Sequence, residues 1–379
     1  MRTEVIELIK GGIGIQYELT VLHFGDERSE RKVYIQGSLH ADEMPGALVS
    51  YYLRQKLEQL ESENRLNAHI ILVPMANPIG MAQSIQYTSF GRFDLFTGRN
   101  FNRLGDLNLY EMTTRQLHDD QVALGQDAQE NTRLIRQAMG KAIASYQPNN
   151  AIESLHHNLV RLAYDADIAL DLHCDCWAMM HIYTLPGLWP QLEPLARYIG
   201  SHCQLVADDS NSNSFDEALS TVWLKLQSDY PQANIPLANV ATTVELRGVH
   251  DLRHEDAEQD SQALINYFIQ QQLITPDEQG VPPMPNLLAE PTPLAGVETI
   301  VAPVNGVVVF RVQPGQNVQA GDAILDLVDP TRGQITTVHA TIDGFVYACN
   351  TLVPFAHIGS ELATIAGAKE LAHGARLSP

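Results

Sequence analysis

The sequence predicts an α/β domain followed by a smaller all-β domain. Strand-like runs at residues 31–38 and 69–75 flank a helical pattern at 45–61, and this alternation is typical of a sheet covered by helices. From residue 297 onward, short β-branched runs alternate with Pro-Gly and Gly-Asp turns instead, which predicts many short strands. Two units of different class are therefore expected in one chain.

A proline-rich segment separates the two units. Residues 275–295 contain the runs Thr-Pro-Asp-Glu-Gln-Gly-Val-Pro-Pro-Met-Pro and Glu-Pro-Thr-Pro, a composition typical of a linker. We therefore expect one domain over residues 1–285 and a second over residues 286–379. The chain of 379 residues has room for both, because domains usually span about 100 to 200 residues.

The remaining elements of the first domain follow the same alternation. Residues 106–165 are polar and glutamine-rich with helical spacing, so we expect helices there that wall the sheet. Further strands are expected at 166–173, 181–185, 203–207 and 239–246, and a further helix near 256–273.

Charge and composition exclude several classes of function. The 24 basic and 45 acidic residues give a formal net charge of -21, which opposes binding to nucleic acid. The charged N-terminus does not resemble a signal peptide, and no apolar run approaches the roughly 18 residues of a membrane-spanning helix. Four cysteines in so long a chain do not suggest a disulfide framework. We expect a cytoplasmic protein that binds neither nucleic acid nor membranes.

The strongest functional signal is the segment Gly-Ser-Leu-His-Ala-Asp-Glu at residues 37–43. It places His40 and Glu43 three positions apart at the end of an apolar run. Both can reach one ion if the chain turns between them, and Pro45-Gly46 marks a helix start directly afterwards. A catalytic zinc ion takes three protein ligands and keeps a fourth position for water. One more ligand is therefore expected.

The third ligand is expected to be His173, at the end of the apolar strand. Alternation along a strand places Asp171, His173 and Asp175 on one face, and Cys174 and Cys176 on the other. The cysteines are thus expected to point away from the metal. Either aspartate is a candidate to orient a ligand histidine, as metal-bound imidazoles usually require.

A carboxylate that could act as general base follows later in the chain. The run Ala-Thr-Thr-Val-Glu-Leu-Arg-Gly at 241–248 reads as a strand with Glu245 near its end. A carboxylate there could deprotonate a zinc-bound water. The alternative is a structural ion pair of Glu245 with Arg247 or Arg253. His181, His202, His250 and His254 lack a comparable context, so we expect them to be packed or on the surface.

The tail resembles a biotinyl/lipoyl-type barrel sandwich, in which an Ala-Pro-x-x-Gly strand, a Pro-Gly-x-x-Val-x-x-Gly-Asp hairpin and an Asp-Gly strand recur. Carrier domains of that type present a lysine at the tip between their halves. Here the corresponding segment Leu-Val-Asp-Pro-Thr-Arg-Gly-Gln-Ile has none, and Lys369 is the only lysine after residue 225. A swinging-arm role is therefore not expected.

His40, Glu43, His173 and Glu245, in that order, give the first 280 or so residues a resemblance to the zinc carboxypeptidase superfamily. Within it, the chain resembles the succinylglutamate desuccinylase/aspartoacylase branch. Asn77-Pro78-Ile79-Gly80 is similar to the superfamily's Asn-Pro-x-Gly turn, and Thr243-Val244-Glu245 to the strand that carries its base. The resemblance implies a mixed sheet covered by helices, one zinc ion per chain and Glu245 as catalytic base.

The same resemblance implies how a substrate is held. Asn102-Arg103 resembles the family's Asn-Arg pair that grips a substrate carboxylate. A further arginine polarises the scissile carbonyl in the family; Arg92 is preferred here and Arg99 is the alternative. Two segments depart from the better-known members, which read His-Gly-Asn-Glu and Asp-Leu-Asn-Arg where this chain has His-Ala-Asp-Glu and Asn-Phe-Asn-Arg. Substrate identity is therefore not carried over.

These features together predict a zinc-dependent amidohydrolase that cleaves a small-molecule N-acyl amino acid. A metallocarboxypeptidase acting on a small peptide would need the same residues. A non-catalytic binding protein with a structural zinc site would keep His40, Glu43 and His173 without needing Glu245. The tail could cap the site or join copies of the chain through its strand edges, so a homo-oligomer stays open.

Overall fold

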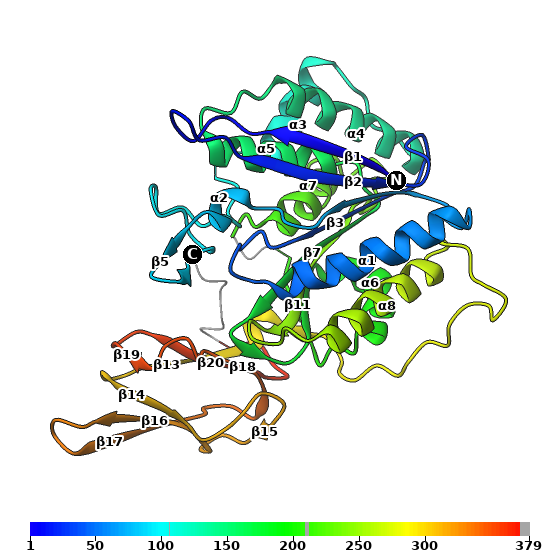
Figure 1. Ribbon diagram of the computed structural model, residues 1–379. Helices are drawn as coiled ribbons and strands as arrows, with labels where there is room; N and C mark the ends of the chain where they lie inside the picture. Colours follow the sequence, from blue (N-terminus) through cyan, green and yellow to red (C-terminus); the bar gives the residue numbers. More distant parts are fainter. Residues whose placement is uncertain (106, 209–211, 372–379) are drawn as a thin grey trace.

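The structure, a computed structural model, describes residues 1–105, 107–208 and 212–371. Its centre is a nine-stranded mixed sheet (Figure 1). In spatial order the strands are β1 (Arg2–Glu7), β2 (Glu18–Phe24), β4 (His69–Val73), β3 (Lys32–Gly37), β7 (Ile168–Asp175), β11 (Val240–Gly248), β9 (His181–Thr184), β10 (Cys203–Val206) and β12 (Thr292–Pro293). Strands β4, β3, β7 and β11 run parallel, so their carboxyl ends meet at one edge.

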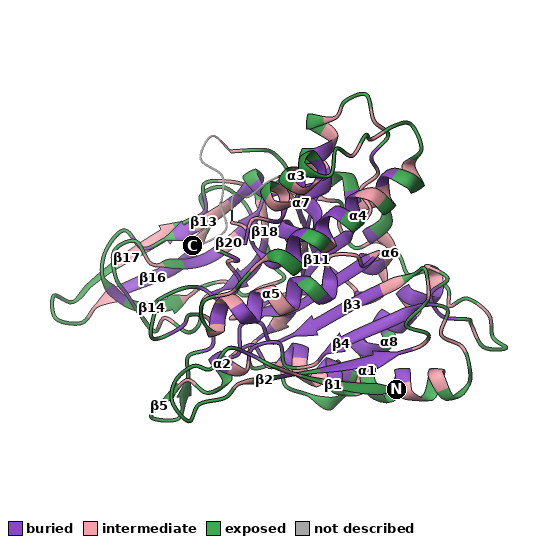
Figure 2. Cartoon of the chain, turned by 90° about the horizontal axis from the view of Figure 1, so that it is seen from above, coloured by how far each residue is buried: buried purple, intermediate pink, exposed green. Residues whose placement is uncertain are grey.

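Helices cover both faces of this sheet (Figure 1). One face carries α1 (Pro45–Ser62), α6 (Trp189–Ile199) and α8 (His254–Gln270); the other carries α3 (Leu109–Asp119), α4 (Ala128–Ser145), α5 (Ala151–Ala163) and α7 (Phe215–Asp229). Alternation along β3 divides the core, because Val33 and Ile35 pack into the first layer and Tyr34 into the second. Figure 2 shows the buried strands between the two helical layers.

The structure confirms the predicted α/β domain with a mixed sheet covered by helices. Each strand predicted in this domain is present, and helices fill residues 109–163 as expected. The predicted helix near 256–273 begins slightly earlier, at His254. The sequence interpretation did not include β1 and β2, which extend the sheet as an antiparallel pair beside β4, nor α6 and α7.

The tail forms two antiparallel sheets around a separate apolar core. One sheet contains β13 (Val297–Val301), β20 (Glu361–Ala366), β18 (Gly344–Cys349) and β15 (Asn317–Val318). The other contains β17 (Gln334–His339), β16 (Ala323–Asp329), β14 (Gly306–Phe310) and β19 (Phe355–Ala356). The tail is thus β-rich as predicted, whereas its assignment to the barrel-sandwich type stays a prediction.

The tail packs against the carboxyl edge of the large sheet (Figure 1). Strand β8 (Trp177–Ala178), which follows β7, pairs with β18 of the tail. The Met179 N–H also donates to the Tyr347 carbonyl oxygen at 2.8 Å. Strand β12 pairs with β10, so the predicted boundary at 285/286 falls just before a strand of the large sheet. Among the described residues, no helix has the length and apolar character needed to cross a membrane.

Candidate metal centre and substrate cavity

A tight turn between β3 and α1 brings His40 and Glu43 together. The Glu43 N–H donates to the His40 carbonyl oxygen at 3.0 Å, and the Ser38 hydroxyl donates to the Glu43 carbonyl oxygen at 3.1 Å. Helix α1 starts close against β7: a Cβ on Gly46 would lie 2.6 Å from the Leu172 carbonyl oxygen. Glycine at this position therefore lets the helix approach β7, and Glu43 reaches His173 as a result.

His40, Glu43 and His173 form one buried cluster, as the sequence predicted. His40 Nδ1 lies 2.9 Å from Glu43 Oε1, and His173 Nδ1 lies 2.8 Å from Glu43 Oε2. The ligand-type atoms of the three residues all lie within 4.8 Å of one another. The Cys174 N–H donates to Glu43 Oε2 at 3.2 Å and helps to fix the carboxylate.

Two further side chains contact the Nε2 atoms of these imidazoles and so orient the rings. Asn100 Oδ1 lies 2.8 Å from His40 Nε2 and also accepts the Asn102 N–H at 2.9 Å. Asp171 Oδ2 lies 2.9 Å from His173 Nε2, a close ionic contact whose angles are poor for a hydrogen bond. Because both partners are acceptors, Nε2 of each histidine carries the hydrogen and Nδ1 is left as the ligand atom.

A buried polar chain continues from Asp171 into the sheet. Gln36 donates through Nε2 to Asp171 Oδ1 at 2.9 Å, and the Tyr34 hydroxyl donates to Gln36 Oε1 at 2.7 Å. Gln36 and Asp171 are directly paired across β3 and β7. The sequence interpretation named Asp171 or Asp175 for this orienting role. In the structure, Asp171 is the aspartate that contacts His173.

The charges of the cluster are strongly linked. Burial would raise the pKa of Glu43, but His40 and His173 hold it well below its usual value. Burial lowers the pKa of His40, and this outweighs the effect of Glu43. For His173 burial acts in the same direction, but Asp171 and Glu43 together raise its pKa well above the usual value. The cluster thus pairs an ionised carboxylate with one imidazole whose pKa is lowered and one whose pKa is raised.

The donor set fits a zinc ion. A neutral His40 whose Nε2 hydrogen points at Asn100 turns the Nδ1 lone pair toward Glu43 Oε1. These two acceptor atoms lie 2.9 Å apart, and the Arg92 guanidinium lies 3.3 Å from both, so the pair faces a positive charge. Two imidazoles and one carboxylate are also the ligand set of known catalytic zinc sites with an open position for water. His40, Glu43 and His173 are therefore suited to hold the metal.

Glu245 lies beside this cluster on the neighbouring strand. It is directly paired with His173 in the β7–β11 register, so both side chains stand on the same face. Burial, and then the nearby Glu43 carboxylate, raise its pKa well above the usual value. Its Oε2 atom is buried without a hydrogen-bond partner in the described structure. The suggested ion pairs are not formed, because Arg247 pairs with Asp260 and Arg253 with Asp256.

The structure separates the two candidate arginines. Arg92 lines the cavity, and its guanidinium lies 3.3 Å from both Glu43 Oε1 and His40 Nδ1. Arg99 instead faces Glu153, with 3.8 Å between Nη1 and Oε1, and is not among the cavity-lining residues. Of the two, only Arg92 stands where it can reach a group bound at the cluster.

Asn102 and Arg103 also border the cavity. Asn102 Oδ1 accepts the Phe215 N–H at 2.8 Å, and its Nδ2 lies 3.4 Å from His173 Nε2. Arg103 donates to the Asn102 carbonyl oxygen at 2.7 Å. Burial, and then the positive charge of Arg92, lower the pKa of Arg103. Two guanidinium groups therefore lie near each other in the cavity, an arrangement that favours an anionic ligand.

The cysteines and the other histidines take no part in the cluster. Cys174 packs into the apolar layer beneath the sheet, as alternation predicted. Both cysteines are nevertheless among the cavity-lining residues, and Cys176 lies beyond the end of β7, where alternation no longer applies. Among the described residues, the ligand group around Glu43 contains no cysteine sulfur. His181 is buried as expected, whereas the exposed His250 also lines the cavity.

A cavity of about 820 Å³ opens in front of the cluster, with walls from both parts of the chain. Its tail wall comes from Thr299, Tyr347, Ala348, Cys349, Asn350, Leu352, Val353, Glu361, Leu362, Ala363 and Thr364. Asn350 is notable because its Oδ1 atom is buried and has no hydrogen-bond partner in the described structure. The sequence interpretation suggested that the tail could cap the site but named no residues for this role. The tail residues that line the cavity are now the candidates for it.

Comparison with a model of the succinylglutamate desuccinylase/aspartoacylase catalytic domain gives a match over residues 29–269. That range contains the His40, Glu43 and His173 cluster, the candidate arginines and Glu245. None of the curated proteins matches this chain.

Several solved structures share the fold over almost the whole chain. A succinylglutamate desuccinylase/aspartoacylase family protein of Shewanella amazonensis is 24% identical with a TM-score of 0.81, covering 97% of this chain and 98% of that one. A second such protein, from Shewanella frigidimarina, is 21% identical with a TM-score of 0.80 and 97% coverage of both chains. The ectoine utilization protein of Ruegeria pomeroyi is 14% identical with a TM-score of 0.62 and the same coverage. The tail therefore belongs to the shared fold.

Proposed function

Because the chain belongs to the succinylglutamate desuccinylase/aspartoacylase family of hydrolases, we propose that it is a zinc-dependent hydrolase that cleaves the amide bond of an N-acyl amino acid. One observation carries the proposal. Glu245, with a buried and unpartnered carboxylate oxygen, stands beside the ligand His173 on the neighbouring strand and faces the same cavity as Arg92 and Arg103. A structural metal site would not need this carboxylate.

His40, Glu43 and His173 would hold one zinc ion, which when bound lowers the pKa of a water ligand to about 7. Glu245 accepts the proton of the attacking water. Burial and the Glu43 carboxylate raise its pKa, which strengthens it as a proton acceptor. The same carboxyl group then gives the proton to the departing amine, so that one residue serves both proton transfers.

The two arginines interact with different negatively charged groups of the substrate. Arg92 is close enough to the cluster to stabilise the oxyanion that develops on the amide carbonyl. Arg103 binds the carboxylate of the amino acid through its planar guanidinium. Since Asn102 Oδ1 already accepts the Phe215 N–H, its Nδ2 group is the part left to contact a substrate. This places a small anionic molecule between the cluster and Asn102-Arg103.

The proposal also includes the cellular location and the role of the second domain. All four cysteines are free, which supports a reducing, cytoplasmic location. We retain 1–285 as the catalytic domain and 286–379 as a β-rich domain that closes the cavity. Apolar and polar side chains of the second domain, Asn350 among them, form the wall opposite the metal cluster. They are therefore the groups that would select the acyl part or the amino-acid part of the substrate.

A substrate panel tests the proposal. The zinc-loaded protein is incubated with N-acetyl, N-succinyl and N-formyl amino acids and with short peptides, and amine release is measured. Cleavage of acyl amino acids establishes the proposed reaction and names the acyl group. Preferential cleavage of peptides would assign the chain to the carboxypeptidases, which use the same residues. No cleavage of any compound would favour a binding protein and contradict the proposal.

A further inference from the structure

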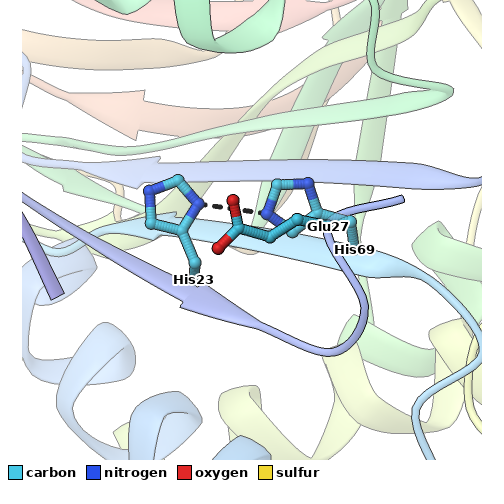
Figure 3. A group of neighbouring side chains, drawn as sticks. All are labelled: His23, Glu27 and His69. Carbon is cyan, nitrogen blue, oxygen red and sulfur yellow. Dashed lines mark hydrogen bonds between the residues drawn. The ribbon is translucent and has the colours of Figure 1, made fainter. Parts of the chain in front are cut away.

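A second group of ligand-type side chains lies away from the candidate active site. His23 is on β2, His69 opens β4 and Glu27 follows β2 in the chain (Figure 3). One ligand-type atom from each lies within 4.8 Å of the other two. His69 is paired with Lys32 at the start of β3, whereas His40 follows the end of that strand. The length of β3, about 16 Å at 3.3 Å per residue, separates the two groups.

The sheet itself brings the two histidines together. Strands β2 and β4 are antiparallel neighbours in which His23 is paired with Ile71. His69 lies two positions before Ile71, so its side chain stands on the same face as that of His23. His23 Nδ1 is 3.0 Å from His69 Nε2, and the two rings are stacked at a centroid distance of 5.3 Å. The two nitrogen atoms thus face each other at hydrogen-bond distance.

A neighbouring carboxylate orients the ring of His23. Glu4 Oε2 lies 3.1 Å from His23 Nε2. Because a carboxylate only accepts, His23 carries its hydrogen on Nε2 and turns the Nδ1 lone pair toward His69. Carboxylate-oriented histidines of this kind are typical of metal sites.

Glu27 supplies a charged oxygen on the solvent side. In the view of Figure 3 its carboxylate overlaps the gap between the two imidazole rings, and one of its oxygens lies within 4.8 Å of a ring nitrogen of each. Arg2 donates to both carboxylate oxygens, at 2.6 and 3.0 Å, and this interaction lowers the pKa of Glu27. Arg2 also donates to Glu4 at 3.0 Å. Arg161 lies 3.9 Å from the other oxygen of Glu4, so two carboxylates and two guanidinium groups surround the two rings.

We propose that His23, Glu27 and His69 form a second divalent metal site, suited to zinc, at the amino end of the sheet. Two imidazoles and one carboxylate supply three ligands and leave a fourth position for water on the exposed side. Tetrahedral zinc at about 2.0 to 2.1 Å from each nitrogen sets the nitrogens about 3.3 Å apart. The observed separation of 3.0 Å therefore needs only a small opening of the pair.

The site has a structural consequence. An ion there joins β2, β4 and the loop after β2, and so fastens the outer antiparallel strands to the parallel part of the sheet. A metal that binds only the folded chain adds to its stability by mass action. Zinc should accordingly raise the melting temperature through this site as well as through the catalytic one. Because the site lies outside the cavity, its loss should leave hydrolysis unchanged.

Zinc titration of the metal-stripped full-length protein tests the inference. Calorimetry and elemental analysis should give two equivalents for the wild type and one for His69→Ala. In Glu27→Gln the second equivalent should bind at least about tenfold more weakly. Glu18→Gln changes an exposed carboxylate on the same strand β2 and serves as the control, with two equivalents expected.

Two outcomes would overturn the inference. One is a wild type that binds no zinc, or a single equivalent that is unchanged in His69→Ala and Glu27→Gln; the other is two equivalents whose affinities are unchanged in both variants. Because Glu27 is exposed, Glu27→Gln keeps the test valid even if His69→Ala fails to fold. The result does not depend on the proposed hydrolysis, since stoichiometry is measured without substrate and the catalytic equivalent is present in every variant.

Discussion

Exchange of Asp171 for asparagine tests how the sheet positions His173, the proposed metal ligand. The Asp171 carboxylate contacts His173 Nε2 at 2.9 Å and accepts from Gln36 at 2.9 Å. In Asp171→Asn, an amide nitrogen turned toward His173 would set two donors against each other. An amide oxygen turned that way would instead set the new nitrogen against Gln36 Nε2. Either orientation leaves one contact broken, unless Gln36 and the Tyr34 hydroxyl also turn over.

The expected loss of zinc affinity follows from the contact between Asp171 and the proposed ligand His173. Loss of a group that orients a ligand histidine typically costs 10- to 100-fold in metal affinity, or about 1.4 to 2.7 kcal/mol. We expect Asp171→Asn to fall in this range. The double variant Asp171→Asn/Gln36→Glu moves the carboxylate one position along the chain of hydrogen bonds, where it can accept from the new amide and from Tyr34. It should recover most of the affinity.

The assay is competition for zinc between the metal-stripped protein and a chelator of known affinity. Far-ultraviolet circular dichroism on the same samples confirms that each variant is folded. Zinc affinity of Asp171→Asn within about twofold of the wild type would refute the reasoning, because the contact with His173 would then contribute nothing to ligand orientation.

Three further predictions follow from the described contacts. Burial lowers the pKa of His156 from 6.5 to about 4. As the pH falls below 6.5, the imidazole is therefore protonated in the unfolded chain but not in the folded one, which destabilises the fold. His156→Gln should reduce the loss of unfolding free energy between pH 7 and 4.5 by about 2.5 kcal/mol, measured by urea unfolding. Arg103→Lys loses the two parallel hydrogen bonds to a carboxylate, so KM should rise about tenfold with kcat less affected, and an unchanged KM would contradict the carboxylate role. Asn350→Leu removes an unpartnered oxygen from the tail wall; the ranking of acyl amino acids should change while zinc content stays constant, and an unchanged ranking would remove the tail from substrate selection.

Local patterns were sufficient to predict that His40, Glu43 and His173 form one cluster. His40 and Glu43 belong to one turn, and His173 and Glu245 each lie near the end of an apolar strand, where side-chain alternation gives their direction. Local patterns do not show which strands are neighbours in the sheet. That β7 lies next to β11, and that His173 is therefore paired with Glu245, follows from the tertiary fold and from the family resemblance.

Residues that act through contacts between distant segments were not predicted. Asn100 orients His40 from a loop sixty positions later in the chain, although its place two residues before Asn102 was a signal that both side chains could face the site. Gln36 meets Asp171 only because β3 pairs with β7. His23 and His69 converge because β2 lies beside β4, and the sequence interpretation did not include β2. The tail wall likewise depends on packing between domains.

The most direct test of the central claim is the rate of hydrolysis by Glu245→Gln on the best substrate of the panel, with zinc content measured in the same samples. The exchange keeps the size of the side chain but removes its ability to accept a proton. We predict a fall in kcat of at least about 100-fold, with the zinc content of the wild type. A rate within tenfold of the wild type at equal zinc content would contradict the assignment of Glu245 as the base.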